Sequence, residues 1–163
     1  MSGGHGHVDG SNKNIAILIA FLAALLAICE MGAKSSQTTV LTEHVEATNQ
    51  WGFFQAKTIR QTTMRTAADG LEAQFKDGGQ PMPPALKTQA DAWRRTAQRY
   101  ETEPETNEGR KELMARAKAA ETKRDRALAA YHHYEMASAA VQIAIVLASA
   151  AIITGISLLI WGA

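Results

Sequence analysis

The sequence predicts an all-α membrane protein, in which two transmembrane helices are joined by a long antiparallel helical stalk, similar to a coiled coil, with a third short helix at its tip. Three observations lead to this prediction. Apolar residues concentrate in two stretches, 15–33 and 137–161. Outside the long segment between them, Lys13 is the only basic residue, and Asp9 and Glu30 are the only acidic ones. Within that segment, one dense cluster of glycine and proline separates runs of helix-forming residues.

Both apolar stretches are long enough to cross a bilayer. A helix needs about 20 apolar residues to span the hydrocarbon core. We therefore predict transmembrane helices over 14–33 and 137–161, with a polar flexible tail over 1–13. A chain of 163 residues offers no further apolar layer to cover two such helices in a soluble protein. The first stretch exceeds the apolar core of a typical signal peptide, and no clear cleavage site follows it, so we expect a retained anchor.

The charged segment between the two spans is predicted to form three helices. Apolar residues recur at intervals of three and four over 34–76, which indicates an amphipathic helix leading away from the first span. The sequence DGGQPMPP at 77–84 predicts a turn. A short tip helix is expected over 85–102, because Pro104 disfavours helical geometry in the residue before it. The returning helix is expected over 108–136, with a spacing close to a seven-residue repeat.

The stalk helices are expected to pack large residues against small ones. If both apolar segments enter the membrane at equal depth, Trp51 and Phe54 face an alanine-rich region that contains Ala117 and Ala120. A hairpin this thin buries little apolar surface, and two long helices alone form a marginal unit. We therefore expect a homo-oligomer or a place in a larger membrane complex.

The distribution of basic residues predicts the topology. Lys and Arg residues beside the ends of spans favour the cytoplasmic side. On the terminal side of the spans only Lys13 is present. The stalk side carries Lys34, Lys118, Lys123, Arg124 and Arg126. We predict that residues 34–136 are cytoplasmic and that both termini lie on the opposite side.

Two polar residues within or beside the predicted spans are candidate functional residues. Glu30 lies near the end of the first span, and Gln142 lies at a similar expected depth in the second. Ionisable groups in a membrane are costly and often functional. Three interpretations remain open for Glu30: a solvated residue at the interface, a polar clamp between helices, or a site for protons or cations.

Small residues in the second span predict close helix packing. They follow the small-xxx-small spacing that lets helix backbones approach each other in a membrane. The candidates are Ala140, Ala144, Ala148, Ala151 and Gly155.

The histidines do not predict a metal site. His132 and His133 are adjacent, and consecutive helical residues point about 100° apart, so they cannot readily chelate one ion together. With Tyr131 and Tyr134 they form an aromatic belt at the membrane interface. Two further histidines in the glycine-rich tail are a poor metal site. No metal or cofactor is expected.

The sequence predicts neither an enzyme nor a nucleic-acid-binding protein. The net charge is +1, and no basic patch with interleaved aromatic residues occurs. Phosphate-binding glycine loops and the motifs HExxH and G-x-S-x-G are absent. Cys29 is the only cysteine, and it lies in the first span, where a Cys–His nucleophile is implausible. No catalytic residue is therefore expected.

Three blocks of sequence resemble a known family. They are NKNIAILIAFLAALLAI (12–28), EATNQWGFFQAKTIRQTTMRTA (46–67) and YHHYEMASAAVQIAIVLASAAIITGI (131–156). The chain is similar to a bacterial domain-of-unknown-function family of small two-span inner-membrane proteins. The resemblance covers nearly the whole chain and implies a bacterial inner-membrane location. It implies no activity and no functional residues.

These observations favour a structural or interaction protein of the membrane. It would be a self-assembling scaffold or an accessory subunit of an inner-membrane complex, with the lipid bilayer as its first partner. The alternative is an oligomeric protein similar to a channel or transporter, in which Glu30 and Gln142 line a polar path. Ion flux that disappears in Glu30→Gln would distinguish the second function from the first.

Overall fold

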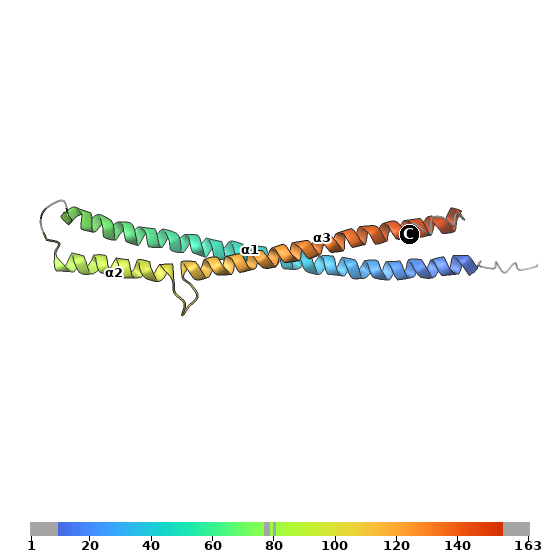
Figure 1. The fold of residues 1–163 in the computed structure, drawn as a ribbon, viewed down its shortest axis with the longest axis horizontal. Helices are drawn as coiled ribbons and strands as arrows, with labels where there is room; N and C mark the ends of the chain where they lie inside the picture. The colour runs from blue at the N-terminus through green and yellow to red at the C-terminus, as the bar shows by residue number, and fades with distance from the viewer. Residues whose placement is uncertain (1–9, 77–78, 80, 155–163) are drawn as a thin grey trace, which may run out of the picture. The chain divides into compact units, whose positions relative to one another are not determined.

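The computed structural model describes residues 10–76, 79 and 81–154, and nearly all of these residues are helical. The three helices are α1 (Gly10–Lys76), α2 (Pro84–Glu101) and α3 (Arg110–Thr154) (Figure 1). No strand occurs in this described part of the chain, so the predicted all-α class is confirmed.

Helix α1 is one uninterrupted element that combines the first apolar stretch with the outgoing polar segment. It starts at Gly10, inside the segment expected as a tail. Helix α3 likewise joins the returning polar segment to the second apolar stretch, and its last described residue is Thr154. Seven residues of the predicted second span, 155–161, therefore lie outside the described residues.

The two breaks between helices fall at glycine and proline residues. Gly79 has a φ of 65°, a left-handed conformation that glycine adopts without strain. Helix α2 then begins with Pro84 at its first position, where the missing proline N–H costs no hydrogen bond. The carbonyl oxygen of Pro83 accepts hydrogen bonds from the backbone N–H groups of Leu86 and Lys87. Helix α2 therefore starts at a proline, and the backbone N–H groups of Leu86 and Lys87 in its first turn have a hydrogen-bond acceptor.

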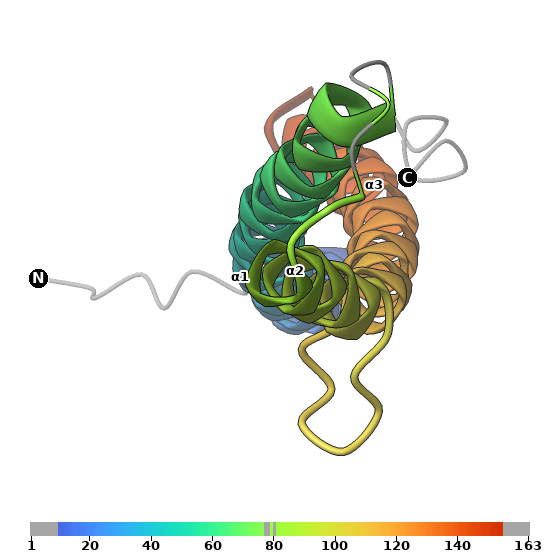
Figure 2. The same cartoon turned by 90° about the vertical axis from the view of Figure 1, so that its left-hand side faces the viewer.

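The connection between α2 and α3 is a compact loop that extends to one side of these helices (Figure 2). Thr102 has an extended backbone that ends α2. The carboxylate of Glu112, in the first turn of α3, accepts hydrogen bonds from the Thr102 hydroxyl at 2.6 Å and from the Glu103 N–H at 3.3 Å. Gly109 is buried beneath this arrangement, and a Cβ there would lie 2.4 Å from the Glu103 nitrogen. The loop therefore requires glycine at this position.

The chain divides into two compact units, and both contain part of α1 and part of α3. Unit 1 comprises Met1–Val40 and Asp125–Ala163. Unit 2 comprises Leu41–Arg124 and includes all of α2.

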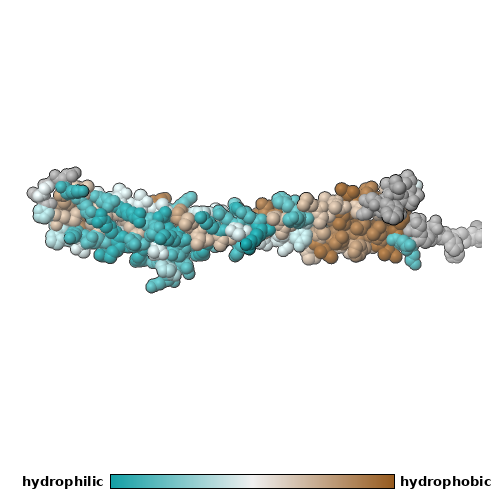
Figure 3. Space-filling view, in the orientation of Figure 1, coloured by the Kyte–Doolittle hydropathy of each residue, from teal (hydrophilic) through white to brown (hydrophobic). Residues whose placement is uncertain are grey.

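Unit 1 is built from the apolar segments, and small residues form its helix contact. Gly32 of α1 packs directly against the ring of Tyr134 of α3, since a Cβ on Gly32 would lie 2.6 Å from that ring. Large apolar side chains instead point outward, and Figure 3 shows hydrophobic residues gathered over the apolar segments of this unit. In the most apolar 18-residue stretch of each helix, only 11% is buried for α1 and 22% for α3. By length and composition, both helices are able to cross a membrane.

Unit 2 packs its three helices through alanine. Ala68 of α1 and Ala117 of α3 are fully buried, and Ala90 and Ala97 of α2 are nearly so. Alanine allows the helices to approach closely, because the distance between helix axes depends on the side chains at the contact. Ion pairs from Arg94 of α2 to two acidic residues of α1 reinforce the contact at the surface.

Candidate functional site

Glu30 and Gln142, the two polar residues expected in the membrane, line one groove in unit 1. The groove has a volume of about 500 Å³ and lies between α1 and α3. Both side chains are exposed. The structure thus brings the two candidates to one surface of the unit.

The small-residue candidates of α3 are only partly on one face. Ala144, Ala148 and Ala151 are buried, with Ala148 fully inaccessible. Ala140 is exposed and does not take part in this contact. The reason is geometric, since a helix that packs at intervals of three and four buries residue 144, half-buries residue 141 and turns residue 140 outward. Gly155 lies outside the described residues.

Trp51 and Phe54 pack against each other and contact α3. Their rings meet edge to face with centroids 5.4 Å apart. The indole Nε1 of Trp51 donates a hydrogen bond to Glu121 at 2.8 Å. The guanidinium of Arg110 lies 5.0 Å from the ring centre of Phe54, a cation–π arrangement.

The alanines expected opposite these aromatic residues are both inside unit 2. Ala117 is 0% exposed and Ala120 is 3% exposed. The hydrogen bond of Trp51 and the cation–π contact of Phe54 nevertheless go to charged residues of α3, which lie on either side of these alanines in the sequence. Residue pattern alone did not indicate these polar partners.

A polar cluster joins the three helices of unit 2, and the sequence did not predict it. Gln61 of α1 is buried, and its amide donates to the Ala97 carbonyl at 3.1 Å and to Glu101 at 2.8 Å. Arg110 donates to the Gln61 amide oxygen at 2.6 Å and to the same Glu101 carboxylate at 2.8 Å. Its Nε donates to the Thr58 hydroxyl. The cluster can set the alignment of α2 and α3 on α1, because each shift would leave a buried polar group unpaired.

Acidic residues at the end of α2 are held in their charged form. The hydrogen bond from Gln61 lowers the pKa of Glu101, and the positive charge of Arg110 lowers it further. Burial raises the pKa of Glu103, but hydrogen bonds from Arg99 and Lys57 outweigh this effect and hold the pKa below its ordinary value. The arrangement is typical of structural ion pairing.

Helix α1 has a second regular face in unit 2 whose residues are all exposed among the residues that the structure describes. We call it the outer face, and it consists of Leu41, Val45, Thr48, Gly52, Gln55, Ile59, Thr62 and Thr66. All of these residues are exposed and uncharged, and their intervals alternate between four and three. The face lies opposite the buried residues Ala47, Gln50 and Gln61.

The outer face contrasts with the rest of the polar surface. Ile59 is 67% exposed and Leu41 is 61% exposed. The exposed side of α3 instead carries charged residues such as Lys118. A helix side that meets only water is normally charged or polar. The seven-residue spacing without charge was a signal in the sequence for this separate face.

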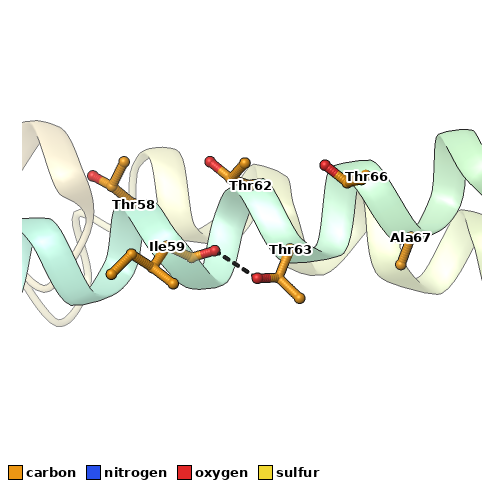
Figure 4. A pocket seen from close by; sticks show the side chains of 6 residues that line it. All are labelled: Thr58, Ile59, Thr62, Thr63, Thr66 and Ala67. Carbon is orange, nitrogen blue, oxygen red and sulfur yellow. Dashed lines mark hydrogen bonds between the residues drawn. The ribbon is translucent and has the colours of Figure 1, made fainter.

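One end of the outer face is shown in Figure 4. A shallow groove of about 600 Å³ runs beside it. The residues that line the groove are Thr58, Ile59, Thr62, Thr63, Thr66 and Ala67. The Thr63 hydroxyl donates to the Ile59 carbonyl, so this threonine satisfies itself within the helix and presents its methyl group outward.

The aromatic residues of α3 beside the apolar segment contact Glu135. The Tyr131 hydroxyl donates to its carboxylate, and Nδ1 of His132 lies 3.7 Å from it. In the described part of the chain, no three His, Cys, Asp or Glu residues come together as metal ligands would.

Fold and surfaces define an all-helical protein with two long helices, each of which carries an apolar segment able to cross a membrane. Residues 11–163 match the family described as Domain of unknown function (DUF4337). The chain belongs to this family. No curated protein and no solved structure matches the chain.

Proposed function

We propose that the protein is a structural membrane protein that assembles with copies of itself. Two transmembrane helices anchor it in the bacterial inner membrane, and the outer face of α1 pairs with the same face of a second copy. The observation that carries this proposal is the outer face itself: a regular, uncharged helical surface within a charged segment.

Membrane anchoring is supported by the surface of unit 1. Large apolar side chains point outward there, including Phe21 at 65% exposure and Ile28 at 63%. Exposure of these side chains to water is unfavourable, whereas contact with lipid acyl chains is not. The order of contacts in unit 2 supports an antiparallel hairpin: Glu43 pairs with Lys123, and Thr58, further along α1, pairs with Arg110.

A helix is the partner that the outer face fits. Its seven-residue repeat matches the seam of a two-stranded coiled coil. Val45, Ile59 and Thr66 occupy equivalent positions of the repeat, where two-stranded parallel coiled coils accept β-branched residues. Gly52 shares that position, and a Cβ there would meet nothing within 4 Å.

A second copy of the chain is electrostatically compatible with the outer face. Because the face has no charge, pairing with itself brings no like charges together and buries no unpaired ion. Two copies in one membrane also share one orientation, which places their α1 helices parallel. Anchoring in a plane raises their effective concentration, so a seam of modest area suffices.

Cysteine crosslinking tests the pairing. In a Cys29→Ala background, Val45→Cys and Ile59→Cys are expected to form disulfide-linked dimers of the full chain in native membranes under mild oxidation. Lys118→Cys, on the exposed side of α3, is the matched control and is expected to stay monomeric. Equal crosslinking at all three positions, or none at any, would contradict pairing through the outer face.

Native mass spectrometry provides the second measurement. The extracted protein is expected at twice 17.6 kDa. Ile59→Glu places two like charges in the seam and is expected to weaken the dimer by about tenfold or more. Lys118→Glu is expected to leave the dimer unchanged. A monomer would contradict self-association, and a complex of one copy with a different protein would show that the face serves another partner.

A further inference from the structure

The groove that contains Glu30 continues into an apolar groove along α3. The polar part is lined by Glu30, Lys34, Glu135 and Ser138, among others. The apolar part has a volume of about 390 Å³ and shares Ala139 and Gln142 with the polar part. We propose that this combined surface binds one phospholipid whose headgroup carries a primary ammonium, with an acyl chain along the apolar part. The proposal rests on the membrane anchoring proposed above.

The polar part offers groups for both charges of such a headgroup. Glu30 and Lys34 lie one helical turn apart, and both are exposed. Neither side chain makes an ion pair or a hydrogen bond with another residue that the structure describes. A carboxylate binds an ammonium through charge-assisted hydrogen bonds, and a lysine ammonium binds a phosphate as a point charge. Glu30 is assigned to the ammonium and Lys34 to the phosphate.

Ser138, which also lines the polar part, has a hydroxyl group without a hydrogen-bond partner among the described residues. Its side-chain oxygen is buried and has no partner among the described residues, and the residue is 9% exposed. A helical serine can donate to the carbonyl one turn earlier, as Ser149 does. A buried hydroxyl without a partner is unfavourable. Ser138 lines the groove, so a rotation of its side chain would bring the hydroxyl to an oxygen of the headgroup or glycerol ester.

The apolar part suits a hydrocarbon chain. Ile143 is 61% exposed and Val146 is 65% exposed, and both line it. These residues follow the polar part along α3 toward the interior of the apolar segment. A ligand that fills both parts must be polar at one end and apolar along its length. A free phosphate or ethanolamine lacks the chain, and a fatty acid lacks the ammonium.

Headgroup chemistry separates this lipid from other phospholipids. A choline headgroup has no N–H to donate to Glu30. A glycerol headgroup leaves Lys34 its phosphate but has no cation to pair with Glu30, so the carboxylates of Glu30 and Glu135 would lie beside an anionic lipid without a counter-charge. Ethanolamine phospholipid is therefore the expected ligand.

Lipid retention in native mass spectrometry tests the proposal. The full chain is titrated with phosphatidylethanolamine, phosphatidylcholine and phosphatidylglycerol that share the same acyl chains. The ethanolamine lipid is expected to bind about tenfold more tightly than either of the others. Equal binding of the three lipids would overturn the proposal.

Variants test the assigned residues. Glu30→Gln and Ser138→Ala are expected to reduce retention of the ethanolamine lipid severalfold, and Lys118→Gln, in unit 2, is the control that keeps it. Ser138→Ala is expected to leave the unfolding temperature of the lipid-free protein unchanged or higher, which a purely structural hydroxyl would not do. Unchanged retention in both groove variants would overturn the site.

Alkaline extraction of membranes separates this proposal from the anchoring on which it depends. Protein that stays in the membrane pellet but shows no lipid preference overturns the lipid site alone. Protein that is released into the supernatant overturns the anchoring, and the lipid site with it.

Discussion

At the scale of single residues, glycine has opposite roles at two positions of unit 2. Gly109 is buried in the loop before α3, and a Cβ there would lie 2.4 Å from the Glu103 nitrogen and 2.7 Å from the Thr102 Cα. Gly70 lies within α1, and a Cβ there would meet nothing within 4 Å. The first glycine is required by packing, whereas the second only weakens its helix.

These two glycines give a matched pair of substitutions. Gly109→Ala is expected to destabilise the protein by about 1–3 kcal/mol, because backbone atoms must move to admit the methyl group. Gly70→Ala is expected to stabilise it by about 1 kcal/mol through helix propensity. Thermal unfolding followed by circular dichroism of the full chain in detergent measures both changes. A stabilising Gly109→Ala would show that the loop rearranges freely.

At the scale of elements, the junction of α2 and α3 depends on carboxylates that must stay ionised. The pKa of Glu112 is lowered, chiefly by the hydrogen bond from Thr102. The pKa values of Glu101 and Glu103 are lowered as well. Each of these residues therefore has a lower pKa in the folded chain than its ordinary value of 4.5.

The lowered pKa values of these carboxylates predict that the protein loses stability in acid. A carboxylate with a lowered folded pKa contributes its full stabilisation above the unfolded pKa, about 4.5, and loses it as the pH falls through the lower folded value. The unfolding temperature is expected to be constant from neutral pH to about pH 5 and to fall below that. Glu112→Gln is expected to make the unfolding temperature fall less steeply in acid, and Glu105→Gln, at an exposed position, is the control. A profile identical in Glu112→Gln and in the native chain would contradict a role for this carboxylate.

At the scale of the whole molecule, the charges beside the apolar segments determine the proposed topology. Basic residues lie on the side of the polar segment, and only Lys13 lies on the terminal side. We therefore propose that residues 34–136 are cytoplasmic.

Labelling of single cysteines tests this orientation. In the Cys29→Ala background, Lys87→Cys is expected to react with a membrane-impermeant maleimide in inverted vesicles but not in intact spheroplasts. Ser2→Cys is expected to react in spheroplasts and to be protected in inverted vesicles. Labelling of both cysteines from the same side would contradict a chain with two spans, and the reverse pattern would invert the orientation.

Much of the fold followed from local sequence. The two apolar stretches, the glycine–proline cluster and Pro104 predicted an all-helical chain with breaks after residue 76 and near residue 103, because helix length, breakers and hydropathy are local properties. The candidate groove was anticipated only in part. Glu30 and Gln142 were identified as unusual polar residues in apolar surroundings, and an assumed equal depth brought them together.

Tertiary structure decided which face each residue occupies. The sequence by itself determined that the chain is helical, where the helices break and where apolar segments lie. It did not show that Gln61 and Arg110 join three helices, that Ala140 is exposed, or that Val45 and Ile59 form a face of their own. The reason is physical: apolar residues at intervals of three and four fit either side of a long helix, and only contact with other helices selects the side that is buried.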